Sequence, residues 1–98
     1  MNHEIKALEF FTKQILKLDT TSKKIIHDKI QLIKQNPYRF KRIHTKTYSK
    51  VFRVRLNIQQ KETRLIYTII EPSIILICLL DRKKDYKDLE KHLKKIQS

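Results

Sequence analysis

Four runs rich in β-branched and aromatic residues follow one another between positions 43 and 80. They cover residues 43–48, 51–57, 63–70 and 73–80, and this composition favours β-strands. The links between the runs are short. A parallel crossover needs about a dozen residues or more, so neighbours joined by short links are antiparallel. This half of the chain is therefore expected to form a mainly antiparallel sheet.

Alternation within the run 51–57 separates two faces of its strand. Phe52, Val54 and Leu56 alternate with Arg53 and Arg55. Successive side chains of a strand point to opposite faces, so the apolar set is expected in the core and both arginines on the other face. Residues 74–80 are apolar throughout, which predicts a central strand covered on both faces.

The remaining chain predicts one more strand and three helices. Residues 4–10 form a short apolar run that indicates a first strand, and helical spacing of apolar residues follows over 11–18 and 22–35, ending at Asn36-Pro37. Residues 84–97 keep near-helical spacing under a lysine-rich surface. The expected fold class is α+β, in one domain spanning residues 1–98: an N-terminal strand and a helical hairpin packed on a four- to five-stranded, mainly antiparallel sheet, with a C-terminal helix.

The chain contains no glycine, although it needs several tight connections. Glycine is the residue that adopts positive φ most readily. We therefore expect a longer loop at residues 58–62 and a proline-assisted turn at 71–73. The same absence excludes a phosphate-cradling P-loop and a dinucleotide fingerprint.

Charge is the strongest compositional signal. The chain has 23 Lys and Arg against 10 Asp and Glu, for a net charge of +13, which favours a polyanionic partner: nucleic acid, acidic protein or anionic membrane. No apolar run approaches the roughly 20 residues that span a bilayer, and the first residues lack the apolar stretch of a signal peptide. We expect a cytoplasmic protein.

Cys78, in an apolar run, is expected to be a buried side chain. The four histidines show no ligand spacing, so no metal is predicted.

Arginines stand on or beside the strand runs at Arg53, Arg55, Arg64 and Arg82, and Tyr86 follows four residues after the last. A guanidinium is always charged and its planar fork of donors fits a phosphate. The alternative for the arginines is a solvated strand face or strand end, and for Tyr86 it is core packing in the last helix.

These segments resemble a known family. FRVRL, a loop, RLIYTI, an apolar strand, then DRKKDY and a helical tail are similar to the RelE/ParE toxin superfamily of toxin–antitoxin systems. The closer match is to RelE-type messenger-RNA interferases. Their pattern is a basic pair on one strand, an arginine that opens the next strand as R-L-x-Y, and a late arginine followed by tyrosine.

The resemblance implies a RelE-like fold and a ribosome-dependent endoribonuclease that cleaves messenger RNA in the ribosomal A site without a metal or cofactor. Arg64 would bind the scissile phosphate, Arg82 would stabilise the transition state or leaving oxygen, and Tyr86 would stack on a base and orient the 2′-hydroxyl. Arg53 and Arg55 would hold flanking phosphates. Lys46 and Lys50 would contact ribosomal or messenger backbone.

Three features depart from the family's pattern, among them the lack of a histidine where some relatives place one near the C-terminus, although His92 lies in the tail. A longer, glycine-free loop before Arg64 would displace that side chain, and Asp81 beside Arg82 would partly neutralise it. Two alternatives therefore stay open: a ParE-like, non-enzymatic inhibitor of DNA gyrase, and a catalytically silent RNA-binding homologue. The expected protein partner is a RelB-like antitoxin with an acidic segment.

Overall fold

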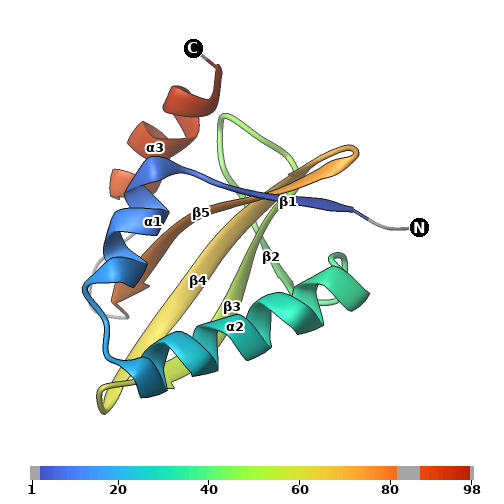
Figure 1. Ribbon diagram of the computed structural model, residues 1–98. Helices are drawn as coiled ribbons and strands as arrows, with labels where there is room; N and C mark the ends of the chain where they lie inside the picture. The colour runs from blue at the N-terminus through green and yellow to red at the C-terminus, as the bar shows by residue number, and fades with distance from the viewer. Residues whose placement is uncertain (1–2, 82–86, 98) are drawn as a thin grey trace.

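Helices cover both faces of one five-stranded sheet (Figure 1). The computed structural model describes residues 3–81 and 87–97, and the sheet order is β1-β5-β4-β3-β2. β1 runs parallel to β5, and the other described neighbours are antiparallel. The expected α+β class is confirmed. The elements are β1 Glu4–Ala7, α1 Glu9–Leu16, α2 Thr20–Gln35, β2 Lys41–Ile43, β3 Val51–Ile58, β4 Lys61–Ile70, β5 Ser73–Asp81 and α3 Lys87–Gln97.

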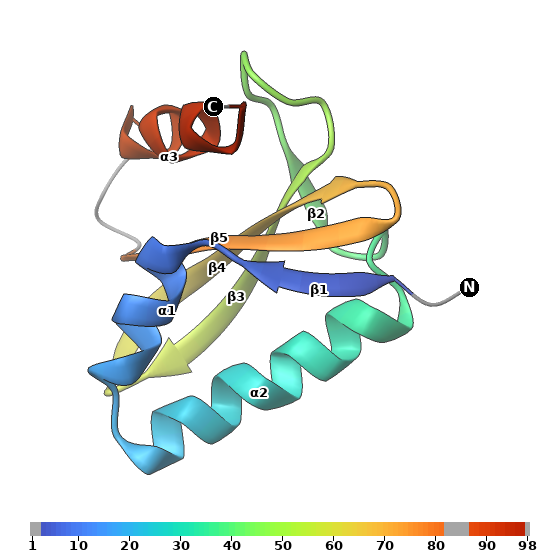
Figure 2. The same cartoon turned by 45° about the horizontal axis from the view of Figure 1, so that its top comes forward.

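The sheet separates two apolar cores. Figure 2 shows α2 on one side of the sheet and α3 on the other. Phe52, Val54 and Leu56 of β3 pack with residues of α1 and α2 in the larger core, as their alternation predicted. Leu89 and Leu93 of α3 are fully buried in the smaller core on the opposite face. We call these the α1/α2 face and the α3 face.

β5 is the central strand that its apolar run predicted. It lies between β1 and β4, with Leu76 in the core of the α1/α2 face and Leu80 in that of the α3 face. Cys78 is completely buried, and burial raises the pKa of its thiol to about 12. The prediction of a buried cysteine is confirmed, and a thiol with this pKa stays protonated at neutral pH.

A glutamine side chain completes the edge of β5 where β1 ends. The pairing of β1 with β5 stops at Ala7 opposite Leu76. Further along, Gln14 of α1 accepts a hydrogen bond from the Leu79 N–H at 2.7 Å and donates one to the Leu79 carbonyl at 2.9 Å. One side-chain amide thus satisfies both backbone groups of a buried residue, as a neighbouring strand would. This contact fixes α1 beside the end of β5.

The β3–β4 connection corrects an expectation. The strands pair as far as Ile58 opposite Lys61, so the turn consists of Gln59 and Gln60 alone rather than a longer loop. Their φ angles are 52° and 62°, as a two-residue hairpin with positive φ at both positions requires. A residue other than glycine in this region costs about 1–2 kcal/mol, which the ten-residue strand β4 can offset through its pairing with both neighbours.

Replacing the turn with asparagine and glycine tests this description. Gln59→Asn with Gln60→Gly should raise the free energy of unfolding by about 1 kcal/mol, because both residues accept positive φ at lower cost. For a domain of this size the melting temperature should rise by about 4–8 °C, measured by circular dichroism. Gln59→Ala with Gln60→Ala is the matched control and should not raise it. A melting temperature unchanged by Asn-Gly would contradict the tight turn.

β2 also differs from expectation. A strand was predicted over residues 43–48, but β2 is Lys41–Ile43 and residues 44–50 form a loop. Thr45 Oγ1 donates to the Tyr48 carbonyl at 2.6 Å, and local hydroxyl bonds of this kind compete with a strand ladder. Glu90 of α3 accepts from the Lys46 N–H at 3.0 Å and from Thr47 Oγ1 at 2.6 Å. The loop is therefore tied to α3 rather than to β3.

The ends of the elements account for smaller differences. β1 stops at Ala7 because α1 begins at Glu9, whereas the sequence predicted a strand to position 10. The C-terminal helix was expected from position 84, and its described part is Lys87–Gln97. α2 ends at Gln35, just before Asn36 and Pro37, as predicted. Within residues 3–81 and 87–97, no helix is both long and apolar enough to cross a membrane.

Candidate nucleic-acid interface

Strand register brings three of the predicted arginines together. Arg55 of β3 lies directly opposite Arg64 of β4, and Arg53 precedes Arg55 by two residues. Directly opposed side chains start about 5 Å apart, and diagonal ones lie within reach of long side chains. Arg53, Arg55 and Arg64 therefore form one row across two strands, which we call the arginine face.

The arginine face lies on the α3 side of the sheet. Ile66, opposite Arg53, and Leu80, opposite Arg64, both belong to the core beneath α3. Arg55 is exposed, while Arg53 and Arg64 are half-buried. The guanidinium groups are thus carried on paired strands at the border of a buried core, which limits their movement.

Like charges oppose each other twice in this region. Arg55 faces Arg64 across β3 and β4, and Lys41 of β2 faces Arg53. Such pairs destabilise an antiparallel sheet. A chain that places two of them on one face gains a strongly positive surface at a cost in folding stability. The row therefore presents several cations on one face of the sheet, as a site for an anion would.

Two acidic residues, Asp81 and Glu62, lie on the strands that carry or border the arginine face. Asp81 was expected to neutralise Arg82 in part. It lies opposite Thr63, and Thr63 in turn lies opposite Leu56 of the α1/α2 core. Asp81 is therefore on the face of the sheet away from Arg64. Glu62 is nearer, opposite Asn57, and lines a depression of about 260 Å³ beside Arg55.

The other predicted residues are placed as follows. Arg82 and Tyr86 lie outside the described residues, so their roles stay predictions. Lys46 is exposed in the loop that Glu90 holds. Lys50 is not in the arginine row: its Nζ lies 5.6 Å from the centre of the Tyr38 ring.

The sequence interpretation missed two features of this region. Lys41 extends the arginine face on β2, and the wrong strand boundary hid its pairing with Arg53. Glu71 accepts hydrogen bonds from the Tyr38 hydroxyl at 2.5 Å and from His3 Nε2 at 3.1 Å, and these two bonds lower the pKa of its carboxyl. These partners are far apart in the chain, so no local pattern could have indicated the cluster.

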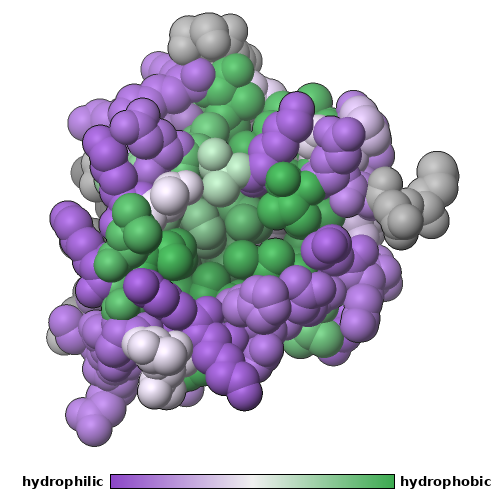
Figure 3. Space-filling view, viewed as in Figure 1, coloured by the Kyte–Doolittle hydropathy of each residue, from purple (hydrophilic) through white to green (hydrophobic). Residues whose placement is uncertain are grey.

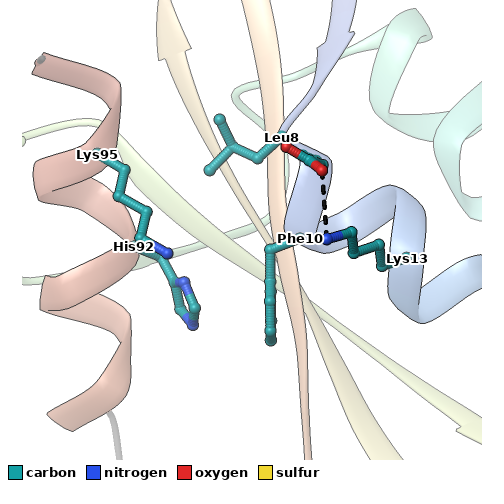
Figure 4. A pocket seen from close by; sticks show the side chains of 6 residues that line it. Leu8, Phe10, Lys13, His92 and Lys95 are labelled. Carbon is teal, nitrogen blue, oxygen red and sulfur yellow. Dashed lines mark ion pairs between the residues drawn. The ribbon is translucent and has the colours of Figure 1, made fainter.

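Two further clefts lie away from the arginine face. In the view of Figure 3, apolar residues gather over the sheet between α1 and α2 and hydrophilic residues surround them. A cleft of about 490 Å³ runs along α1 and the end of β5, between residues that include Leu18 and Leu79. A smaller one of about 320 Å³ lies between α1 and α3, where the ring of Phe10 stacks on His92 with centroids 4.2 Å apart (Figure 4). This stack joins α3 to α1.

The row of guanidinium groups is suited to one kind of chemistry. Planar forks on neighbouring strands can donate to several oxygens of one phosphodiester and to the phosphates beside it. Positive groups fixed before reaction stabilise charge that develops on phosphate oxygens. The described arginines are therefore suited to binding a phosphate and to stabilising charge on its oxygens.

The sheet order, the helical hairpin on one face and the C-terminal helix beside a basic strand pair define the class of this protein: it has the RelE-like fold. Solved structures similar to it include RelE toxins, free or with an antitoxin. A free Escherichia coli RelE mutant is 15% identical with a TM-score of 0.74, and the match covers 98% of both chains. The expected RelE-like fold is confirmed.

Two complexes are also similar in structure. The intact E. coli RelBE toxin–antitoxin complex matches with 16% identity and a TM-score of 0.64, over 84% of this chain and 99% of the other. The archaeal RelE–RelB complex from Pyrococcus horikoshii matches with 16% identity and a TM-score of 0.62, over 87% and 100%. No protein family model and no curated protein sequence matches the chain. Identities this low establish the fold alone.

Proposed function

We propose that this protein is the toxin of a type II toxin–antitoxin system, and that it cleaves messenger RNA on the ribosome. The observation that carries the proposal is the register of β3 and β4, which places Arg55 opposite Arg64 and Arg53 in the same row on a RelE-like fold. The two-residue turn at Gln59 and Gln60 keeps Arg64 in this row.

The proposed reaction divides into binding and proton transfer. The 2′-hydroxyl gives up its proton and attacks the adjacent phosphorus, and the bond to the 5′-oxygen breaks. That oxygen takes up a proton and a cyclic phosphate remains. Arg64 donates to the scissile phosphate and stabilises its developing charge, while Arg53 and Arg55 hold the flanking phosphates. By resemblance, Arg82 assists the leaving oxygen and Tyr86 orients the 2′-hydroxyl. Guanidinium groups supply the positive charge, so this mechanism needs no metal ion.

The proposed protein partner is an antitoxin of the RelB type. Three of the similar structures are RelE toxins together with RelB or a RelB peptide. A net charge of +13 on this chain favours an acidic segment in the partner, because complementary charge speeds association and fixes its orientation. Binding of such a segment over the arginine face would keep the toxin inactive. Ribosomes and messenger RNA place the activity in the cytoplasm.

Primer extension on a defined messenger in a cell-free translation reaction tests the cleavage. We expect discrete cuts at codons that ribosomes occupy, and no cuts on the same messenger when ribosomes are omitted. An intact messenger in the presence of translating ribosomes and folded protein would refute the proposal. The next measurement would then be inhibition of gyrase supercoiling, which the ParE-like alternative predicts.

A further inference from the structure

An exposed aromatic ring with two cations lies on the face opposite the arginines. Tyr38, just after α2, is 46% exposed. Lys50 Nζ is 5.6 Å from the centre of its ring, and the Arg42 guanidinium is 5.8 Å from the ring centre of Phe52, on whose ring Tyr38 packs edge-on at 6.0 Å. We call Tyr38, Arg42 and Lys50 the Tyr38 patch.

The Tyr38 ring is held in place although it is exposed. Its hydroxyl donates to Glu71 at 2.5 Å, and Glu71 is itself held by His3. Beneath it, Phe52 stacks on the buried ring of Tyr67 with centroids 5.3 Å apart. A ring fixed in this way loses little conformational entropy when a planar group packs against it. Capping of the core alone would explain the ring but not the two cations that accompany it.

A continuous basic path joins the Tyr38 patch to the arginine face. β2 is an edge strand, so its alternate side chains point to the two faces of the sheet at the edge itself. Lys41 lies opposite Arg53 on the arginine face, and Arg42 lies opposite Phe52 on the other face. Positive charge therefore continues from Arg53 through Lys41 and around the edge to Arg42. Glu71 is the acidic group in direct contact with Tyr38, and His3 Nε2 lies 3.1 Å from its carboxyl oxygen.

We propose that the Tyr38 patch is a second contact site for single-stranded RNA, which passes from the arginine face around the edge strand β2. Arg42 and Lys50 bind backbone phosphates, and a base packs against the Tyr38 ring. Basic side chains interleaved with exposed aromatic rings are the combination that binds single strands without strong sequence preference. The inference rests on the proposed function in taking RNA as the ligand, but it concerns binding and does not depend on cleavage.

Fluorescence anisotropy with a labelled 2′-O-methyl oligoribonucleotide of about ten nucleotides measures this contact, because the methyl groups prevent cleavage. Arg42→Ala with Lys50→Ala should weaken binding and reduce the slope of log K against log salt by about 1.4, since each single-strand phosphate contact contributes about 0.7. Tyr38→Ala should weaken binding about tenfold through the loss of stacking. Tyr38→Phe keeps the ring and should bind nearly as the unaltered protein does.

The matched control removes the same charge elsewhere. Lys23 and Lys24 are exposed near the start of α2, at the other end of that helix from Tyr38. Lys23→Ala with Lys24→Ala should leave the salt slope unchanged. An equal loss of slope in the two double variants would mean a general charge effect and would overturn the proposal. Thermal melting of each variant shows whether it is folded.

Two comparisons separate this proposal from its rivals. If polyglutamate of equal charge binds as tightly as the oligonucleotide and loses as much affinity in Tyr38→Ala, the patch is a site for an acidic protein and the proposal is wrong. If cleavage is absent but the patch variants still lose RNA affinity, the proposed enzymatic function fails and the RNA contact stands. If the protein cleaves messenger RNA but the patch variants bind RNA with unchanged affinity, the proposed RNA contact is wrong and the proposed function stands.

Discussion

Arg64→Ala should lower the rate of messenger cleavage about 10²–10³-fold, the loss expected when one fixed donor to a developing charge is removed. Arg64 is half-buried in the middle of the paired strands β3 and β4, so its position is set by the sheet. It lies directly opposite Arg55, the most exposed arginine of the row. A single-turnover assay on ribosomes that carry a defined messenger would measure the rate.

Two further variants make this result specific to Arg64. Arg64→Lys keeps the charge but loses the planar fork, so its rate should fall between those of the alanine variant and the unaltered protein. Lys23→Ala removes one exposed charge far from the row and should leave the rate unchanged. Arg55→Ala should weaken binding to the loaded ribosome more than it lowers the rate. Wild-type cleavage by Arg64→Ala would refute its assignment to the scissile phosphate.

The arginine variants should remain folded, because the strand register places like charges directly opposite each other. Arg55 and Arg64 repel each other across the strand pair, and Arg53 and Lys41 do the same. Removing one member of such a pair relieves repulsion. Thermal melting of each arginine variant, measured beside its cleavage rate, separates a loss of activity from a loss of fold.

Local patterns in the sequence predicted much of the fold. The alternation of Phe52, Val54 and Leu56 with two arginines placed each side chain of β3 on the correct face. The unbroken apolar run of β5 predicted its central position. β2 was misplaced because β-propensity continues past Ile43. The structure there follows a hydrogen bond that Thr45 donates and others that Glu90, more than 40 positions from the loop, accepts. Contacts so distant leave no local signal.

The candidate site depended on one detail that the sequence did not reveal. Alternation along β3 was enough to place Arg53 and Arg55 on one face of the sheet. Which residue of β4 lies opposite Arg55 depends on the length of the turn between the two strands. A shift of one residue in the register would place Arg64 on the opposite face of the sheet. Gln59 and Gln60 adopt positive φ without the usual Asn-Gly sequence, so a longer loop was the natural expectation. The connection is in fact a two-residue turn, and Arg64 lies directly opposite Arg55.

The two defining residues of the R-L-x-Y segment, which suggested the family, lie on opposite faces of the sheet. Arg64 belongs to the arginine face, whereas Tyr67 is completely buried in the core of the α1/α2 face. Tyr67 stacks on Phe52, its direct partner on β3, and donates from its hydroxyl to the Pro37 carbonyl at 2.6 Å. This residue therefore holds the end of α2 against the strands that carry the arginines.

Tyr67→Ala should cost about 3–5 kcal/mol of unfolding free energy, because it removes a buried ring and leaves a cavity beside Phe52. A domain of this kind has only about 5–15 kcal/mol in total, so urea denaturation at 25 °C should show a much lower midpoint. Tyr67→Phe keeps the ring and leaves the Pro37 carbonyl without its donor, at a cost of about 1–3 kcal/mol. Equal losses in both variants would show that the hydrogen bond, rather than the ring, holds α2. The smaller loss expected for phenylalanine would assign most of the stability to the stacked rings, and the motif's tyrosine to folding rather than to catalysis.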